Sequence, residues 1–169
     1  MFYVGITHTD WFLQLKDDFA NKKVERYINF WTPGTKEFKA IEEGNLFLFK
    51  LHNNKLRKEN GQIVGGAYYS HFEIKSIEEA WEEYGRGNGR ESLSAMRLSL
   101  KEVRERNGIP MGNKIGCIIL ENAFFFDKIR WIAEPVDWRK NIVSGKRYST
   151  DEEIGNELYQ TVLKSIEKV

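Results

Sequence analysis

Cysteine is almost absent from this chain, because Cys117 is the only one among its 169 residues. A single thiol excludes an internal disulfide and a zinc site built from several cysteine ligands. Cys117 stands inside the apolar run 115–120, which is typical of a buried strand, and there a free thiol behaves as a small hydrophobic group. We therefore expect Cys117 to be structural and not a nucleophile.

Motifs for catalysis and for cofactor binding are also scarce. The three histidines, His8, His52 and His71, form no metal-ligand pair at helical or zinc-finger spacing. No glycine-rich phosphate loop is followed by Lys-Ser or Lys-Thr, and the glycine-rich segment 85–89 follows a predicted helix, where a dinucleotide site needs a strand. The sequence therefore predicts a binding protein, with no metal, no cofactor and no catalytic residues of its own.

An excess of charge of one sign is lacking as well, since 26 basic and 25 acidic residues leave a net charge of +1. This balance argues against coating of long nucleic acids by charge alone, although it permits one local basic face. With 41% hydrophobic and 14% aromatic residues, the composition predicts a folded single domain over 1–169. Residues 1–6 lack the basic region of a signal peptide, and no apolar run is long enough to cross a bilayer, so we expect a cytoplasmic protein that does not contact membranes.

Alternation and helical spacing predict strands and helices in mixed order along the chain. The predicted strands cover 1–6, 46–51, 63–72, 114–120 (with an extension over 123–126) and 131–132. The predicted helices cover 11–19, 76–84, 91–105 and a last segment capped by Ser149 or Thr150, with loops over 52–62 and 135–146. Ser76 and Glu79 have the spacing of a capping box, and the paired glycines Gly65 and Gly66 predict a bulge or a close backbone approach. This order indicates an α+β fold with a largely non-sequential sheet.

Aromatic residues are the most informative feature that the chain does have, above all in the segment Asn29–Gly34. Here Phe30 and Trp31 directly precede a proline and a glycine. Pro33 lacks a backbone hydrogen-bond donor and Gly34 permits unusual backbone angles, so the segment is predicted to turn. Core packing alone explains large rings in a turn poorly, whereas a nucleobase can stack on an exposed indole.

The other four tryptophans differ in what their surroundings predict. Trp81 has helical spacing with core residues, Trp131 is expected to be half-buried, and Trp138 lies in a basic loop. Trp11 opens a helix directly after capping residues. Trp11 and Trp31 are therefore the best candidates for two rings around a base.

A basic loop is the candidate for contacts with phosphate groups. Exposed Lys and Arg side chains, together with Ser hydroxyls and backbone N–H groups, suit phosphate oxygens. A merely solvated loop is the alternative interpretation. The candidate residues are Arg139, Lys140, Ser144, Lys146 and Arg147, with Lys55 in the predicted loop 52–62 as a second contact point.

Short motifs over nearly the whole chain resemble those of one known group of domains. The segments Tyr3–Thr7, Asn29–Pro33, Gly44–Lys50 and Ile63–Gly66 resemble the EVE/YTH branch of the PUA-like superfamily. More closely, the segments 80–89, 115–126 and 141–146 look like the EVE-like N-terminal domain of HNH restriction endonucleases. The resemblance implies a PUA-like fold, in which a twisted sheet or small pseudo-barrel is flanked by helices.

The resemblance also implies a function and the residues that perform it. Members of this group hold a modified base, flipped from a duplex or taken from a single strand, in an aromatic cage, and they serve modification-dependent (type IV) restriction. Trp31 and Thr32 match the position of a cage tryptophan followed by Ser or Thr. The polar residues implied near the base are Thr7, His8, Asp10 and Asn29. The second ring stays open between Trp11, Tyr69 and an aromatic residue of 124–131.

The chain departs from that group because it shows no His-Asn-His metal site and no zinc knuckle. The resemblance therefore implies a domain that binds DNA without cutting it, with a nuclease in cis or in trans. A modified cytosine, such as 5-methylcytosine or 5-hydroxymethylcytosine, is the expected target. A reader of modified adenine, an RNA-binding PUA-like module, and a small-molecule or protein-interaction domain are the alternatives.

Overall fold

The computed structural model describes residues 1–54 and 59–168 of an α+β chain, so Lys55 lies outside the described residues. The chain forms two compact units. The first consists of Met1–Thr9, Ala40–Tyr69 and Asn122–Val169, and the second of Asp10–Lys39 and Ser70–Glu121. The strands β6 (Ile63–Ser76) and β7 (Lys114–Phe125) contribute residues to both units.

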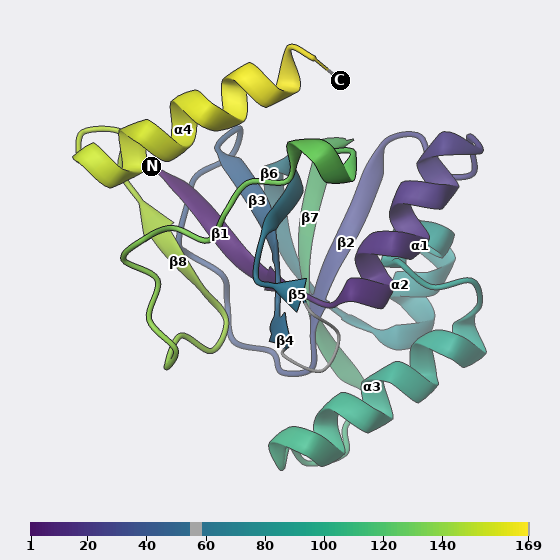
Figure 1. The fold of residues 1–169 in the computed structure, drawn as a ribbon. Coiled ribbons are helices and arrows are strands. Elements are labelled where there is room, and N and C mark those ends of the chain that lie inside the picture. Colours follow the sequence, from purple (N-terminus) through teal and green to yellow (C-terminus); the bar gives the residue numbers. More distant parts are fainter. Residues whose placement is uncertain (55–58, 169) are drawn as a thin grey trace. The chain divides into compact units, whose positions relative to one another are not determined.

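The first unit is built on a mixed sheet (Figure 1). Its strands are β1 (Phe2–Thr7), β3 (Leu46–Leu51), β8 (Gly145–Tyr148) and the first half of β6. Strand β1 is parallel to β3, with Val4 opposite Leu48, while β8 pairs antiparallel with β1 and β6 pairs antiparallel with β3. A separate two-stranded ribbon joins β4 (Asn53–Asn54) to β5 (Glu59–Asn60).

Helix α4 (Glu153–Ile166) covers the core of the first unit. It buries Leu158 and Val162 in a cluster with Phe2 and Leu48 of the sheet. The predicted close approach at the paired glycines is confirmed, because a Cβ on Gly65 would lie 2.4 Å from the Phe124 carbonyl oxygen. The predicted bulge is confirmed as well by a register shift between Phe49 and Lys50 in the β3–β6 pairing.

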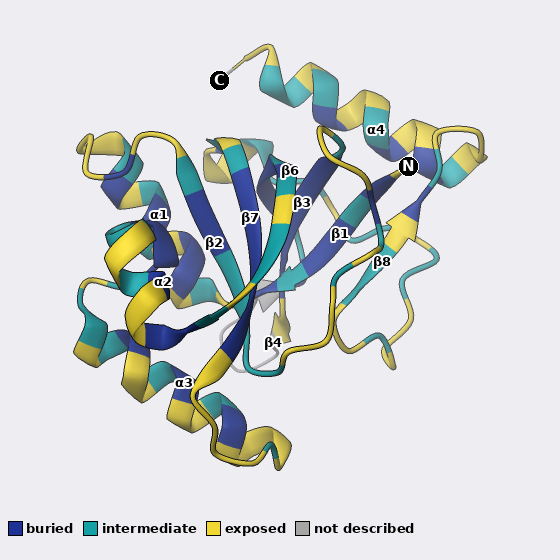
Figure 2. Cartoon of the chain, turned by 180° about the vertical axis from the view of Figure 1, so that it is seen from behind, coloured by how far each residue is buried: buried dark blue, intermediate teal, exposed yellow. Residues whose placement is uncertain are grey.

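The second unit combines β2 (Tyr27–Thr32) and the second unit's part of β7 with three helices. Strand β2 pairs antiparallel with β7, and the helices are α1 (Thr9–Ala20), α2 (Ile77–Tyr84) and α3 (Leu93–Asn107). A 3₁₀ turn, η2 (Gly85–Asn88), follows α2. Figure 2 shows exposed residues over much of α2 and α3, whereas β7 is buried from 115 to 120. The helices and this strand share a core that includes Met96, Leu100 and Ile115.

The start of α2 follows the sequence prediction closely. Ser76 Oγ accepts a hydrogen bond from the Glu79 backbone N–H at 3.1 Å, and Glu79 Oε1 accepts one from the Ser76 N–H at 3.0 Å. This capping box satisfies two donors that a helix N-terminus leaves unpaired. It also lowers the pKa of Glu79 to about 2, mainly through the Ser76 backbone bond and then with the help of Lys114.

Several local predictions were wrong. The expected strand over 131–132 is absent, since Ile132 makes only an isolated bridge with Ile63, and the expected loop 52–62 contains β4 and β5. Asn29–Thr32 belongs to strand β2 and not to a turn, because all four residues pair with β7 and the strand ends only at Thr32, directly before Pro33. Helix α4 begins at Glu153, since Ser149 Oγ accepts from Asp151 N–H in a local turn and no side chain caps the helix. Strand β8 begins within the last two residues of the expected loop 135–146 and runs on to Tyr148, because pairing with β1 outweighs a weak local pattern.

Candidate functional site

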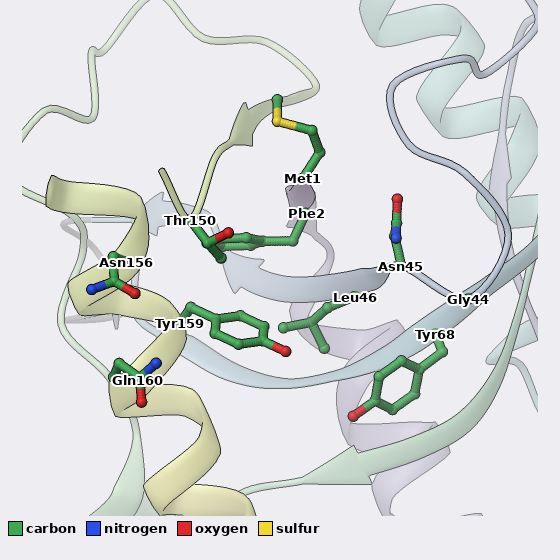
Figure 3. Close-up of a pocket in the computed structure, with 10 residues that line it drawn as sticks. All are labelled: Met1, Phe2, Gly44, Asn45, Leu46, Tyr68, Thr150, Asn156, Tyr159 and Gln160. Carbon is green, nitrogen blue, oxygen red and sulfur yellow. The ribbon is translucent and has the colours of Figure 1, made fainter. Parts of the chain in front are cut away.

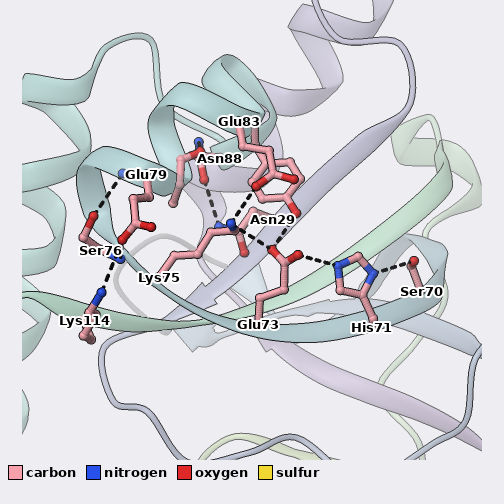
Figure 4. Close-up of polar contacts among 12 residues, drawn as sticks. Asn29, Ser70, His71, Glu73, Lys75, Ser76, Glu79, Glu83, Asn88 and Lys114 are labelled. Carbon is pink, nitrogen blue, oxygen red and sulfur yellow. Dashed lines mark hydrogen bonds and ion pairs between the residues drawn. The ribbon is translucent and has the colours of Figure 1, made fainter.

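Asn88 is the centre of a buried hydrogen-bond network in the second unit. It closes η2 and is fully buried. Its Nδ2 donates to the carbonyl oxygens of Ala80 (3.0 Å) and Gly85 (2.8 Å), and its Oδ1 accepts from Nδ2 of Asn29 at 2.9 Å. Figure 4 shows the contact between the two asparagines. The side chain of Asn88 therefore ties α2 and η2 to strand β2.

Trp31 is half-buried, and the same turn holds its indole in one orientation. Its Nε1 donates to the backbone oxygen of Asn88 at 3.0 Å, and its ring packs against the cluster that contains Cys117. The Arg90 guanidinium lies 5.8 Å from the centre of the ring, within reach of a weak cation–π attraction. Arg90 is anchored in turn, because its Nε donates to Ser99 Oγ at 2.7 Å. Trp31 thus offers a fixed ring that keeps some exposed surface.

Trp11 has a different environment, since only 4% of its surface is exposed. Its Nε1 donates to the Asn29 carbonyl oxygen at 3.2 Å, and its ring meets that of Phe30 edge-on at 5.2 Å. A Cβ on Gly89 would lie 2.1 Å from the Trp11 ring, so glycine is required for this packing. Because side chains alternate along a strand, Phe30 and Trp31 point to opposite faces of β2. Trp11 therefore packs in the interior, and it does not form a ring pair with Trp31.

Asn29 is fully buried at the middle of β2. Among the described residues, its Oδ1 is the one buried side-chain nitrogen or oxygen without a hydrogen bond. Such an atom costs about 1–3 kcal/mol. Nearby, burial raises the pKa of the Cys117 thiol to about 11, and the Asn29 side chain offsets part of that shift. The thiol is buried and protonated at neutral pH, as the sequence predicted for a structural cysteine.

Thr32 and Asp10 are the remaining predicted cage residues of the second unit. Thr32 Oγ1 donates to the Gly34 carbonyl oxygen at 3.1 Å and so helps to close the turn after β2. Its lone pairs can still accept a hydrogen bond. Asp10 is exposed in the first turn of α1, where the helix dipole favours a carboxylate.

The other three predicted cage residues belong to the first unit. Thr7 and Tyr69 are buried, and the Thr7 hydroxyl donates to the carbonyl oxygen two residues earlier. His8 is exposed, and its ring meets the ring of His52 edge-on at 5.3 Å. The two histidines lie together because Thr7 pairs with Leu51 in the parallel β1–β3 register, and each histidine follows directly.

Lys146 differs from the other predicted phosphate contacts because it already has an anionic partner. Its Nζ is ion-paired with Asp137, whose other oxygen accepts from the Tyr148 hydroxyl at 2.8 Å. Burial alone would raise the pKa of Asp137, but these hydrogen bonds outweigh burial and lower it. Asp137 therefore stays ionised and holds Lys146 in place.

The loop that carries the predicted phosphate contacts is anchored to the first unit. Lys50 is 2% exposed, its Nζ lies 3.1 Å from a Glu134 carboxylate oxygen, and it stands 4.5 Å from the centre of the Trp138 ring. Arg139 and Lys140 directly follow this anchor and are exposed. Two more exposed candidates lie beyond them, Ser144 and Arg147. Arg139, Lys140 and Arg147 form no ion pair within residues 1–54 and 59–168.

A second polar chain follows the part of β6 in the second unit (Figure 4). Ser70 Oγ and His71 Nδ1 are 2.9 Å apart, His71 Nε2 lies 2.9 Å from Glu73 Oε1, and the Tyr84 hydroxyl donates to Glu73 Oε2 at 2.8 Å. Burial alone would raise the pKa of Glu73, but the bonds from His71 and Tyr84 and the charge of Lys75 lower it. The chain joins near neighbours in sequence to α2, so we assign it a structural role.

Sequence reasoning missed Asn88 and Arg90, the two residues that hold or face the Trp31 ring. Asn88 lies in the glycine-rich segment 85–89 and Arg90 directly follows it, and neither position carried a sign of its contacts with β2. In the described part of the chain, no three His, Cys, Asp or Glu side chains gather as a metal site. Among the same residues, no helix has the length and hydrophobicity that a membrane span requires. No protein-family model, curated protein or solved structure matches the chain.

Proposed function

We propose that this chain is a PUA-like domain that reads a modified base in DNA, with Trp31 as one wall of the base site. The observation that carries the proposal is the indole of Trp31, which is half-buried on β2 and fixed by its bond to the Asn88 carbonyl oxygen. A ring held in one orientation loses little freedom when a base stacks on it, so more of the stacking energy is available for binding. The Thr32 hydroxyl follows in sequence and can accept a bond from a base edge.

The energetics of base extraction suit a nearly neutral domain. Taking a base out of a stack costs a few kcal/mol, and stacking on an aromatic ring returns about 1–3 kcal/mol. Discrimination then depends on the pocket more than on total charge, which fits the net charge of +1. The exposed Arg139, Lys140 and Arg147 would add phosphate contacts without sequence preference. Lys146 would first have to leave Asp137.

The proposal assigns binding to this chain and cutting to a nuclease in cis or in trans. It takes a modified cytosine as the target, and Trp31 with Thr32 as the primary contacts. Asp10, which belongs to the same unit and is exposed, remains a proposed edge contact. Binding of a modified adenine or of RNA is the main competing function, because stacking on an indole tolerates every base.

The test is a binding titration of matched duplexes that differ in one base, cytosine or 5-methylcytosine, with 5-hydroxymethylcytosine as a third arm. The wild-type chain is expected to prefer one modified duplex. Trp31→Ala is expected to weaken binding of the preferred modified duplex by about 5- to 150-fold, the equivalent of one stacked base, and to weaken binding of the cytosine duplex less, so that the preference falls. Trp31→Phe, which keeps a ring and loses the indole N–H, should retain part of the preference.

Trp81→Ala is the matched control, because Trp81 is also half-buried and packs against the same cluster. It is expected to lower stability and leave the ratio of the two affinities unchanged. An unchanged ratio in Trp31→Ala would exclude Trp31 as a cage wall. Tighter binding of a matched RNA than of any modified duplex would favour the RNA-binding alternative.

A further inference from the structure

A cavity of about 470 Å³ lies in the first unit beside α4 (Figure 3). None of the residues proposed for base or phosphate contacts lines it. Its size falls within the range of about 300–1,000 Å³ that is usual for small-molecule sites. The proposed DNA contacts therefore do not account for this cavity.

Aromatic rings from three elements form part of the cavity wall. Phe2 comes from β1, Tyr68 from β6 and Tyr159 from α4. The rings of Phe2 and Tyr159 are 5.8 Å apart and inclined at 41°, and Tyr68 rests on Phe124 at 6.3 Å. Figure 3 shows the Tyr68 and Tyr159 hydroxyl groups directed into the same space. The wall thus offers flat apolar surfaces with polar tips.

Carboxamide groups line the other parts of the cavity. Asn156 and Gln160 are four residues apart on α4, so they share one face of the helix. Within the described residues, neither side chain makes a hydrogen bond to the protein. Asn45 lies just before β3, and its Oδ1 accepts from the Glu42 backbone N–H at 3.0 Å, which leaves its Nδ2 as a donor.

None of the side chains that line the cavity is charged. The Tyr68 phenol also stays neutral, because burial, followed by the effect of Tyr159, raises its pKa. A phosphate or carboxylate would find no cationic side chain here, and desolvating such a group without a partner is costly. The lining side chains therefore favour an uncharged ligand, and Met1 adds the terminal amino group of the chain to the residues around the cavity.

We propose that this cavity binds one nucleobase-like ring, an uncharged planar heterocycle with neighbouring donors and acceptors on its edge. A carboxamide presents one donor group and one acceptor in a plane, which is the pattern that pairs with a base edge, and phenol or phenyl rings supply stacking surface. The ring can belong to a free nucleoside or to a base of a single strand. This site is separate from the Trp31 site, so either proposal can fail alone.

The test is calorimetric titration of the full chain with the four ribonucleosides, their 5′-monophosphates, a tetranucleotide and glucose. At least one nucleoside should bind saturably, and its monophosphate should bind no more than about 3-fold more tightly, because no cationic side chain lines the cavity. Tighter binding of the tetranucleotide would identify a base in a strand as the natural source. Tighter binding of the nucleoside would identify a free metabolite.

Three variants and one control locate the site. Tyr159→Ala should weaken nucleoside binding by about 10-fold, within the range for one lost stacking contact. Because that variant also loses packing on Phe2, the double variant Asn156→Ala, Gln160→Ala at two exposed positions provides an independent test and should reduce the differences among bases. Lys164→Ala, exposed on the same helix outside the cavity, should have no effect.

Trp31→Ala separates this proposal from the preceding one. Nucleoside binding that persists in Trp31→Ala and weakens in the carboxamide double variant supports the cavity. Loss of binding in Trp31→Ala with no change in the double variant would assign the nucleoside to the Trp31 site and overturn the proposal. The absence of saturable binding by every nucleoside and by the tetranucleotide, or equal binding of glucose, would overturn it too.

Discussion

Removal of the Asn88 side chain is expected to open the second unit. Asn88→Ala deletes three hydrogen bonds, a buried one donated to the Ala80 carbonyl oxygen, a partly buried one donated to the Gly85 carbonyl oxygen and a buried one accepted from Asn29. Each is worth about 1 kcal/mol net, and the partners left unpaired in the interior add to the loss. We expect a loss of about 3–5 kcal/mol and a fall in Tm of about 10 °C for a chain of this size.

Cys117 provides the assay, because it is the only cysteine in the chain and lies in the second unit. The thiol is fully buried and burial raises its pKa to about 11, so a disulfide reagent reacts with it only when the unit opens. When opening is fast and reversible, the labelling rate follows the opening equilibrium. Asn88→Ala should therefore label about 10²- to 4 × 10³-fold faster, at one decade for each 1.4 kcal/mol.

Two further variants show whether the effect comes from these bonds. Asn88→Asp keeps the shape and loses the donors to both carbonyl oxygens, so it should label at least as fast as Asn88→Ala. Asn113→Ala is the control, since Asn113 is exposed in the same unit and makes no side-chain hydrogen bond within the described residues. If Asn88→Ala labels within about 3-fold of that control, the network does not hold the unit together.

Two other predictions concern charged groups of the second unit. Arg86→Ala should lower the free energy of unfolding in urea by about 3–5 kcal/mol. The variant removes the hydrogen bond that Arg86 Nη2 donates at 2.9 Å to the carboxylate of Asp18, which is fully buried. The uncharged double variant Asp18→Leu, Arg86→Leu should recover part of that loss. Burial alone would raise the pKa of Glu73, but hydrogen bonds hold it below its ordinary value of 4.5. The ionised carboxylate therefore stabilises the fold above pH 4.5, and this contribution is lost as the pH falls through the lowered pKa. Acid unfolding of Glu73→Gln should show a smaller fall in stability over that range, and an identical pH profile would contradict the assignment.

The sequence predicts well those parts of the fold that short-range signals determine. Ser76 and Glu79 stand three residues apart, and their reciprocal bonds form within one helical turn, so the start of α2 can be read from the sequence. Neighbouring atoms lie so close to Gly65 and Gly66 that a Cβ would clash with them, so only glycine fits at these two positions. In both cases the deciding interaction depends on the residue type itself.

The errors arise where partners distant in sequence decide the structure. Pro33 and Gly34 correctly predict where the chain turns. The two aromatic residues before them belong to a strand, because they pair with β7, which lies about 90 residues further along the chain. Asn88 and Asn29 are 59 residues apart, and neither residue type predicts burial. The site residues follow the same rule, since the neighbours of Trp31 depend on a pairing that only the folded chain shows.

The two buried asparagines bear on the proposal that a base stacks on the Trp31 ring. Apolar residues of similar shape in place of Asn29 and Asn88 could be nearly neutral for stability, and Asn29 even leaves one oxygen unpaired. Stability alone therefore does not explain their presence. Their bonds fix the turn η2, and the Asn88 carbonyl oxygen in that turn receives the indole N–H of Trp31. A polar pair that adds little net stability while it orients a half-exposed ring is consistent with the proposed base site, because a ring that is already in place loses little freedom on binding.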